Sequence, residues 1–174
     1  MGQLLVQWCK HLGAWVVGTV SSDAKAAAVR TAGADAVINY GGDYNFLDEA
    51  LSLTDGKGVD LAFDAVGAAT LANTIKALAK GGTAISYGSA SGRPPAIETS
   101  QLAPKCARLA VGALFTYIAD ASELQTRAAH VVDAIRSGWL RMGQGTAYPL
   151  ARVAESHGDI EGRGTQGKLY LTPE

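Results

Sequence analysis

The segment at residues 14–40 constrains the fold most, because it divides into a strand, a loop, a helix and a second strand. Residues 15–20 are apolar and rich in β-branched side chains, as expected of a strand buried on both faces. The alanine-rich residues 23–32 predict a helix that Gly33 ends, and residues 36–39 predict a second short strand. A strand, a right-handed helical crossover and a parallel strand make half of a nucleotide-binding fold.

The loop after the first of these strands carries residues that favour a phosphate group. Ser21 and Ser22 offer hydroxyls, the helix offers free N–H groups at its N-terminus, and Lys25 adds a positive charge. This combination suits the ribose 2′-phosphate of NADPH, whereas a site for NADH is expected to have an acidic side chain at the strand end. Asp23 is interpreted as complementing the helix dipole and pointing away from the ligand. An ordinary surface loop with a solvated lysine explains these residues equally well.

The rest of the chain continues the alternation of strand and helix, which indicates a parallel α/β sheet in a single domain of 174 residues. Further strands are expected at residues 59–66, 83–87, 109–115 and 168–171. Helices are expected at residues 2–12, 46–53, 67–79, 122–137 and 152–157. In the helix at 122–137, Ser122 is the expected cap, and the side chains expected to face inward are Leu124, Ala128, Val131, Val132 and Ile135.

Composition argues against several functional classes. The 15 basic and 16 acidic residues nearly balance, which is unlike the basic footprint of a dedicated nucleic-acid binder. No apolar run reaches the roughly 20 residues of a membrane helix, and no signal peptide is expected. Cys9 and Cys106 are too few for a disulfide framework, which favours a reducing, cytoplasmic compartment. Cys9 and His11 do not share a helix face, so no metal site is expected.

Five blocks of sequence, in order, resemble the NADPH-dependent quinone oxidoreductases, the zinc-independent branch of the medium-chain dehydrogenase/reductase superfamily. They read GTVSSDAKAAAVRTAGADAVINY, GKGVDLAFDAVG, LAKGGTAISYGSASG, YPLARVAESH and GTQGKLYL. The resemblance implies a Rossmann-like parallel sheet with helices on both faces. It also implies that residues 1–174 are a truncated cofactor domain, without the family's N-terminal barrel domain, first nucleotide-binding strand and most of the AAxGGVG turn. Residues 146–174 are then the segment that would return to the missing catalytic domain.

The resemblance also implies a set of cofactor-binding positions. Ser21, Ser22 and Lys25 match the family's 2′-phosphate loop, Tyr40 matches a tyrosine near the adenosine phosphate, and Gly2 matches the last glycine of the turn. The other matches, at strand ends, are Val66, Gly67, Gly88, Ser89, Phe115 and Thr116. Simpler explanations stay open: turn chemistry for the glycines, a half-buried tyrosine with its hydroxyl in water, and core packing for Phe115.

The reaction implied by the resemblance is hydride transfer from NADPH to a quinone or an activated enone, with no catalytic metal. No nucleophile–base pair or acid–base dyad is recognisable, and His11, His130 and His157 are interpreted as exposed, so no catalytic residue is assigned. One alternative is an enoyl or alkenal reductase, or an alcohol dehydrogenase, of the same superfamily. Another is a truncated, non-catalytic binding or interaction module.

Two further expectations concern the chain as a unit. The isolated chain is expected to have little or no reductase activity, because the missing barrel would close over the nicotinamide and exclude water. The apolar run at residues 109–115, from Leu109 to Phe115, is expected at an edge of the sheet. It is predicted to join two copies into a homodimer, because an open edge strand offers unpaired backbone groups to another chain.

Overall fold

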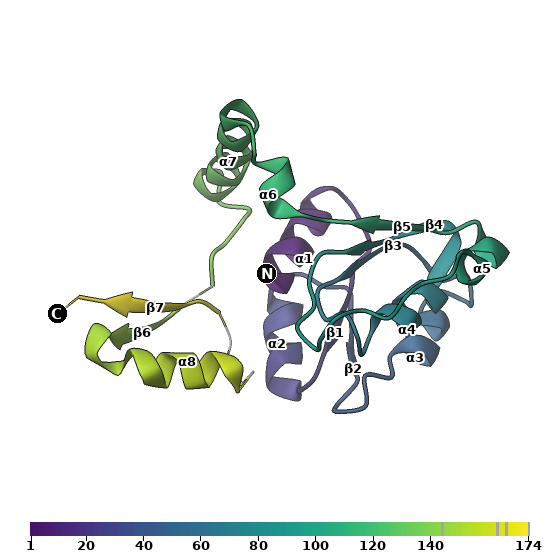
Figure 1. Ribbon diagram of the computed structural model, residues 1–174, viewed down its shortest axis with the longest axis horizontal. Coiled ribbons are helices and arrows are strands. Elements are labelled where there is room, and N and C mark those ends of the chain that lie inside the picture. Colours follow the sequence, from purple (N-terminus) through teal and green to yellow (C-terminus); the bar gives the residue numbers. More distant parts are fainter. Residues whose placement is uncertain (144, 163, 166, 174) are drawn as a thin grey trace.

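The computed structural model describes residues 1–143, 145–162, 164–165 and 167–173, and it has the expected parallel α/β architecture (Figure 1). The strands are β1 (Val17–Val20), β2 (Ala36–Asn39), β3 (Val59–Asp64), β4 (Leu78–Ser86), β5 (Arg108–Val111), β6 (Thr146–Pro149) and β7 (Leu169–Thr172). The α-helices are α1 (Gly2–His11), α2 (Asp23–Thr31), α3 (Leu47–Ser52), α4 (Leu71–Lys76), α5 (Thr99–Leu102), α6 (Leu114–Tyr117), α7 (Ala121–Arg136) and α8 (Val153–Glu161). Two short 3₁₀ turns are η1 (Ala103–Lys105) and η2 (Leu150–Arg152).

The strands of the main body form two hydrogen-bonded groups, with a break between β1 and β3. In the first group β1 pairs in parallel with β2, and in the second the order is β3-β4-β5. Among the described residues β1 and β3 are therefore each paired along one edge only. The break lies where the resemblance to quinone oxidoreductases implies an additional strand.

Apolar side chains connect the two groups of strands. A buried cluster joins Ile38 of β2, Phe46 and Ala50 at α3, and Ala77 at the junction of α4 and β4; Val17 of β1 packs against it. Ile38 is only 1% exposed. Burial of apolar surface is non-directional, so it holds the groups together without a continuous hydrogen-bond ladder.

The expected helix at residues 67–79 is shorter than predicted, and the strand after it is longer. The chain leaves α4 at Lys76, and the Val59 N–H donates to the Ala77 carbonyl at 2.9 Å, which draws the chain into the ladder. A shift of register follows, because Val59 pairs with Leu78 whereas Leu61 pairs with Thr83. The glycines at positions 81 and 82 occupy this irregularity, where the sequence had suggested a helix end.

The prediction of a strand at residues 109–115 is wrong for the second half of that range. β5 does lie at the edge of the three-stranded sheet, but it ends at Val111. After Gly112 the chain turns into α6, in which the Tyr117 N–H donates to the Ala113 carbonyl at 3.3 Å. Phe115 and Thr116 therefore lie on a short exposed helix, and Phe115 is 84% exposed instead of packing in a core.

The helix α7 also departs from expectation, because it projects from the main body (Figure 1). Ala134 is its buried residue, whereas the other side chains expected to face inward are exposed: Leu124, Ala128, Val131, Val132 and Ile135. Its cap is Asp120, which accepts hydrogen bonds from the N–H groups of Ser122 and Glu123 at 2.8 and 3.2 Å. Periodicity thus located the helix correctly, although its apolar stripe has no covering layer within the described residues.

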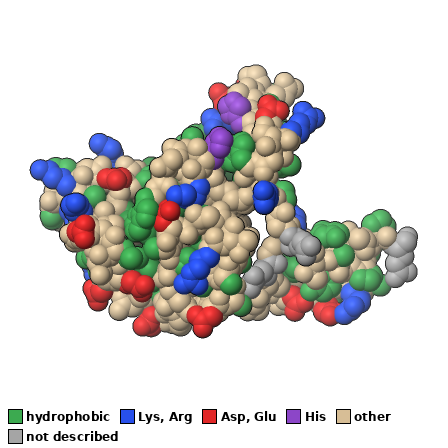
Figure 2. Space-filling view, turned by 180° about the vertical axis from the view of Figure 1, so that it is seen from behind, with side chains coloured by type: hydrophobic (Ala, Val, Ile, Leu, Met, Phe, Trp, Pro, Cys, Tyr) green, Lys and Arg blue, Asp and Glu red, His purple; other side chains and the backbone are tan. Residues whose placement is uncertain are grey.

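The last segment forms a separate lobe of its own, in which β6 pairs in parallel with β7 and α8 packs on both strands (Figures 1 and 2). Tyr148 of β6 is 9% exposed, and its hydroxyl donates to the Asp159 carboxylate of α8 at 2.5 Å. This bond to the carboxylate raises the pKa of Tyr148. Positions 163, 166 and 174 of the segment expected to return to a catalytic domain lie outside the described residues.

Candidate functional site

The strand ends of β1 and β2 bring one group of predicted residues together. The Tyr40 N–H donates to the Val20 carbonyl at 2.9 Å, which sets Tyr40 beside the start of the Ser21–Ser22 loop. Its ring stacks on Tyr44, with 5.1 Å between the ring centroids, and packs against the buried cluster. Tyr40 is therefore a partly buried aromatic side chain at the mouth of this loop.

The loop itself has the arrangement that its sequence predicts. The Ser22 Oγ caps α2 by accepting from the Lys25 N–H at 3.4 Å, and the Lys25 Nζ donates to the Ser21 Oγ at 3.2 Å. Asp23 turns toward β2, where its Oδ1 accepts from the Asn39 side-chain amide at 2.7 Å. The lysine ammonium and both serines are thus on one short loop at the start of a helix, a combination that can bind a phosphate dianion.

The loops after β3 and β4 bring the second group together. The Ser91 Oγ donates to the Val66 carbonyl at 2.7 Å and accepts from the Ala69 N–H at 2.9 Å. Gly67 has φ +88°, and a Cβ there would lie 2.8 Å from the Gly92 carbonyl oxygen. A Cβ on Gly88 would lie 2.6 Å from the carbonyl oxygen of Ala65. Close backbone contact between the two loops therefore suffices to explain both glycines, whether or not a ligand binds there.

A buried carboxylate that the sequence analysis missed supports this second group. Asp64, at the end of β3 and 3% exposed, accepts from the N–H groups of Val66 and Gly67, both at 2.9 Å. The hydroxyls of Thr70 and Thr74 also donate to it, at 2.9 and 2.7 Å. The spacing of an aspartate at a strand end followed by two threonines four residues apart was the available signal. Burial, together with the charge of Asp64, raises the pKa of the adjacent Tyr87.

The remaining predicted positions belong to two helices, α1 and α6. Gly2 is the first residue of α1, and nothing lies within 4 Å of where its Cβ would be. Phe115 and Thr116 are on the exposed α6, as described above.

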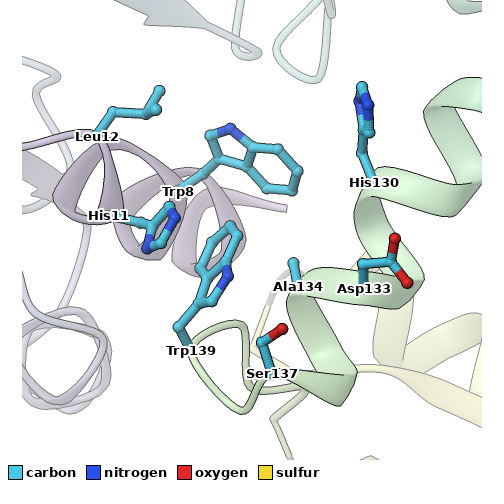
Figure 3. A pocket seen from close by; sticks show the side chains of 8 residues that line it. All are labelled: Trp8, His11, Leu12, His130, Asp133, Ala134, Ser137 and Trp139. Carbon is cyan, nitrogen blue, oxygen red and sulfur yellow. The ribbon is translucent and has the colours of Figure 1, made fainter.

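An open pocket of about 320 Å³ lies elsewhere, between α1 and α7 (Figure 3). The Trp139 ring contacts Trp8 edge-to-face at 5.0 Å and stacks on His11 at 3.8 Å. None of the predicted cofactor positions lines this pocket. The strand-end loops are the candidate site, because ligands of open parallel α/β sheets bind at the carboxyl ends of the strands.

Comparison with known protein families shows to which family the chain belongs. The family model described as zinc-binding dehydrogenase matches residues 1–133. The chain belongs to this family. Among the described residues, no group of three or more His, Cys, Asp or Glu side chains could hold a metal ion, so the residues present do not fit a zinc site and no step is assigned to one.

Quinone oxidoreductases are among the homologues of the chain. Quinone oxidoreductase 1 of Escherichia coli is 31% identical over 99% of this chain and 54% of its own length. A 2-haloacrylate reductase of a Burkholderia species is 34% identical, over 100% and 53%. A mycobacterial structure described as complexed with NADPH is 38% identical, with a TM-score of 0.91 over 99% of this chain and 54% of that one. The chain thus spans about half the length of the relatives it matches.

Proposed function

We propose that this chain is the NADPH-binding part of a reductase that transfers hydride to quinones or activated enones. The observation that carries the proposal is the loop in which the Lys25 ammonium contacts the Ser21 hydroxyl at 3.2 Å, at the start of α2. The sequence likeness to quinone oxidoreductases and the structural likeness to an NADPH complex support it. The likeness to a 2-haloacrylate reductase favours an activated alkene as a second candidate acceptor.

The roles of the residues follow from their chemistry. Ser21, Ser22 and Lys25 would hold the ribose 2′-phosphate through charge-assisted hydrogen bonds, and Tyr40 would lie beside the adenosine. Gly67 and Gly88 would let the loops after β3 and β4 pack closely at the strand ends, where ligands of open parallel sheets bind. NADPH, when bound, supplies a hydride from its nicotinamide ring. The protein's contribution is to orient the donor and exclude water, and no side chain is assigned a proton transfer.

Titration calorimetry with NADPH and NADH tests the proposal. We expect the chain to bind NADPH more tightly, and Lys25→Ala to weaken NADPH binding by about tenfold or more while changing NADH binding little. Lys57→Ala, which removes a lysine from the loop after α3, is the matched control. Equal NADPH affinity in the Lys25 variant and the parent chain would remove Lys25 from the site.

Activity is proposed to need more than this chain. Hydride transfer needs an acceptor held at reacting distance and shielded from water, which the family resemblance assigns to an N-terminal barrel domain. We expect no measurable oxidation of NADPH with a simple quinone by the chain alone, followed as absorbance loss at the nicotinamide band. Turnover at a rate typical of intact enzymes would contradict this part of the proposal.

A homodimer joined through β5 is also proposed. β5 is an edge strand, and an exposed apolar surface continues from it: Val111 is 74%, Leu114 66% and Phe115 84% exposed.

The free thiols of Cys9 and Cys106 support a reducing, cytoplasmic compartment. No described helix has both the length and the apolar character needed to cross a membrane.

A further inference from the structure

The side chain of Asp23 is held by a specific partner. It is the first residue of α2, directly after the cap Ser22. Its Oδ1 accepts a 2.7 Å hydrogen bond from the Nδ2 of Asn39, the last residue of β2. The Asn39 Oδ1 in turn accepts from the Gly41 N–H at 3.2 Å. Because the oxygen of the amide is engaged by an N–H donor, the NH₂ group is the end that faces Asp23.

The position of this carboxylate matters for the charge of the loop. Asp23 is the acidic residue in the first turn of α2, and Lys25 follows it by two positions. A carboxylate turned toward Ser21 and Ser22 would repel a phosphate dianion and would accept hydrogen bonds from unphosphorylated ribose hydroxyls instead. In the structure the Asp23 carboxylate instead accepts from the Asn39 amide, so one of its oxygens is already engaged.

We propose that Asn39 is a positioning residue for cofactor selectivity, which acts by engaging the Asp23 carboxylate in a hydrogen bond and so keeping it from accepting from ribose hydroxyls at the Ser21–Ser22–Lys25 loop. This inference rests on the proposed function, because it concerns the same phosphate site. Asparagine suits the task, since its amide donates to the carboxylate without adding charge, and its oxygen fixes the turn at Gly41. The sequence thus combines a residue that would favour NADH with a second one that neutralises its effect.

The test is a double-mutant cycle on the full chain, with NADPH and NADH as the titrated ligands. Asn39→Ala frees Asp23, so the ratio of NADPH to NADH affinity is expected to fall by roughly threefold to tenfold. In an Asp23→Asn background, Asn39→Ala is expected to leave that ratio unchanged, because no carboxylate remains to be released. Raising the salt concentration is expected to shrink the effect, since it screens exposed charges.

Asn39→Asp distinguishes the two roles of Asn39, which accepts from the Gly41 N–H in the turn and donates to the Asp23 carboxylate. The aspartate can still accept from the Gly41 N–H but cannot donate to Asp23, so it too is expected to lower the ratio. Thermal melting of each variant identifies any that fails to fold. If Asn39→Ala or Asn39→Asp does not fold, Asn39→Ser at this exposed position is tested in its place. An equal change in both affinities, or an effect that persists in the Asp23→Asn background, would overturn the inference. A parent chain without preference for NADPH would refute the proposed function itself, before any Asn39 variant is compared.

Discussion

Thr74 donates a 2.7 Å hydrogen bond to the Asp64 carboxylate from ten residues further along the chain, and both side chains are buried. The same carboxylate receives two backbone N–H groups from the loop after β3. One aspartate therefore fixes the end of a strand, the turn that follows it and the helix that the turn leads to. Such a fully bonded carboxylate makes its neighbours dependent on it.

We expect Asp64→Ala to lower the free energy of unfolding by about 2–4 kcal/mol, because it leaves buried N–H and hydroxyl groups without an acceptor. Asp64→Asn, which keeps one oxygen acceptor, should lose less. Urea denaturation measures both. The matched control is Asp60→Asn on the exposed side of β3, expected to change stability by less than about 0.5 kcal/mol. Equal stability of the Asp64→Ala and Asp60→Asn variants would contradict this role.

Acid sensitivity is expected from Asp35, which ties the start of β2 to α1. Its carboxylate accepts from the Lys10 Nζ at 2.8 Å and from the Val16 N–H at 2.7 Å. The bond to Lys10, followed by the one to Val16, lowers the pKa of Asp35 in the folded chain. Its stabilising contribution is therefore present above the unfolded-state pKa of about 3.9, and it is lost as the pH falls through the lower, folded value.

We accordingly expect the stability of Asp35→Asn to depend less steeply on pH between about 5 and 2 than that of the parent chain. Urea denaturation at a series of pH values gives this slope. Identical slopes for Asp35→Asn and the parent would mean that the ion pair does not form in solution.

Amide hydrogen exchange should reveal the break between β1 and β3. The carbonyls of Val16 and Val20 accept from the side of β2, so the alternation of a parallel strand directs Gly18 toward β2 and Thr19 toward the break. We expect the Thr19 amide to exchange at least about tenfold faster than the Gly18 amide in a dilute sample. Equal, strong protection of both amides would mean that another strand fills the break.

The proposed dimer predicts a change of mass on a single substitution. Val111→Lys places a charge on the exposed end of the β5 edge, which should disfavour pairing with another edge strand. Light scattering is expected to report a dimer for the parent and a monomer for this variant. Leu12→Lys, at an exposed apolar position beyond α1, should leave the dimer intact. A parent chain that is monomeric at high concentration would refute the proposal.

Local sequence predicted those elements whose signals are themselves local. β2 and the start of α2 lie where the apolar residues 36–39 and the alanine-rich residues 23–32 indicated, and the residues of the phosphate loop do lie together. These features depend on neighbours within a few positions. The partnership of Asp23 with Asn39 spans 16 positions, and sequence periodicity carries no information about it.

The incorrect and missed predictions concern contacts that form only on folding. An apolar run as short as residues 109–115 is compatible with a strand or with a strand followed by a helical turn. In the structure the bond from the Gly112 N–H to the Ser86 carbonyl follows the last residue of β5, and the chain then turns into α6. The apolar stripe of α7 located the helix but not its buried residue, which is Ala134, because the neighbouring layers determine which side chains are covered. The Asp64 network was missed because its four donors, two to ten residues further along the chain, converge on the carboxylate only when the loop and α4 have formed.

The apolar cluster of Ile38, Phe46, Ala50 and Ala77 has a thermal consequence. Where strands share a ladder, hydrogen bonds couple them at every temperature, but here the coupling between β1-β2 and β3-β4-β5 depends on apolar burial. That driving force weakens on cooling because of its heat-capacity signature. On cooling, the β1-β2 group and the β3-β4-β5 group should therefore cease to unfold as one cooperative unit before the strands within either group separate. The contact between the two groups is thus expected to be cold-labile.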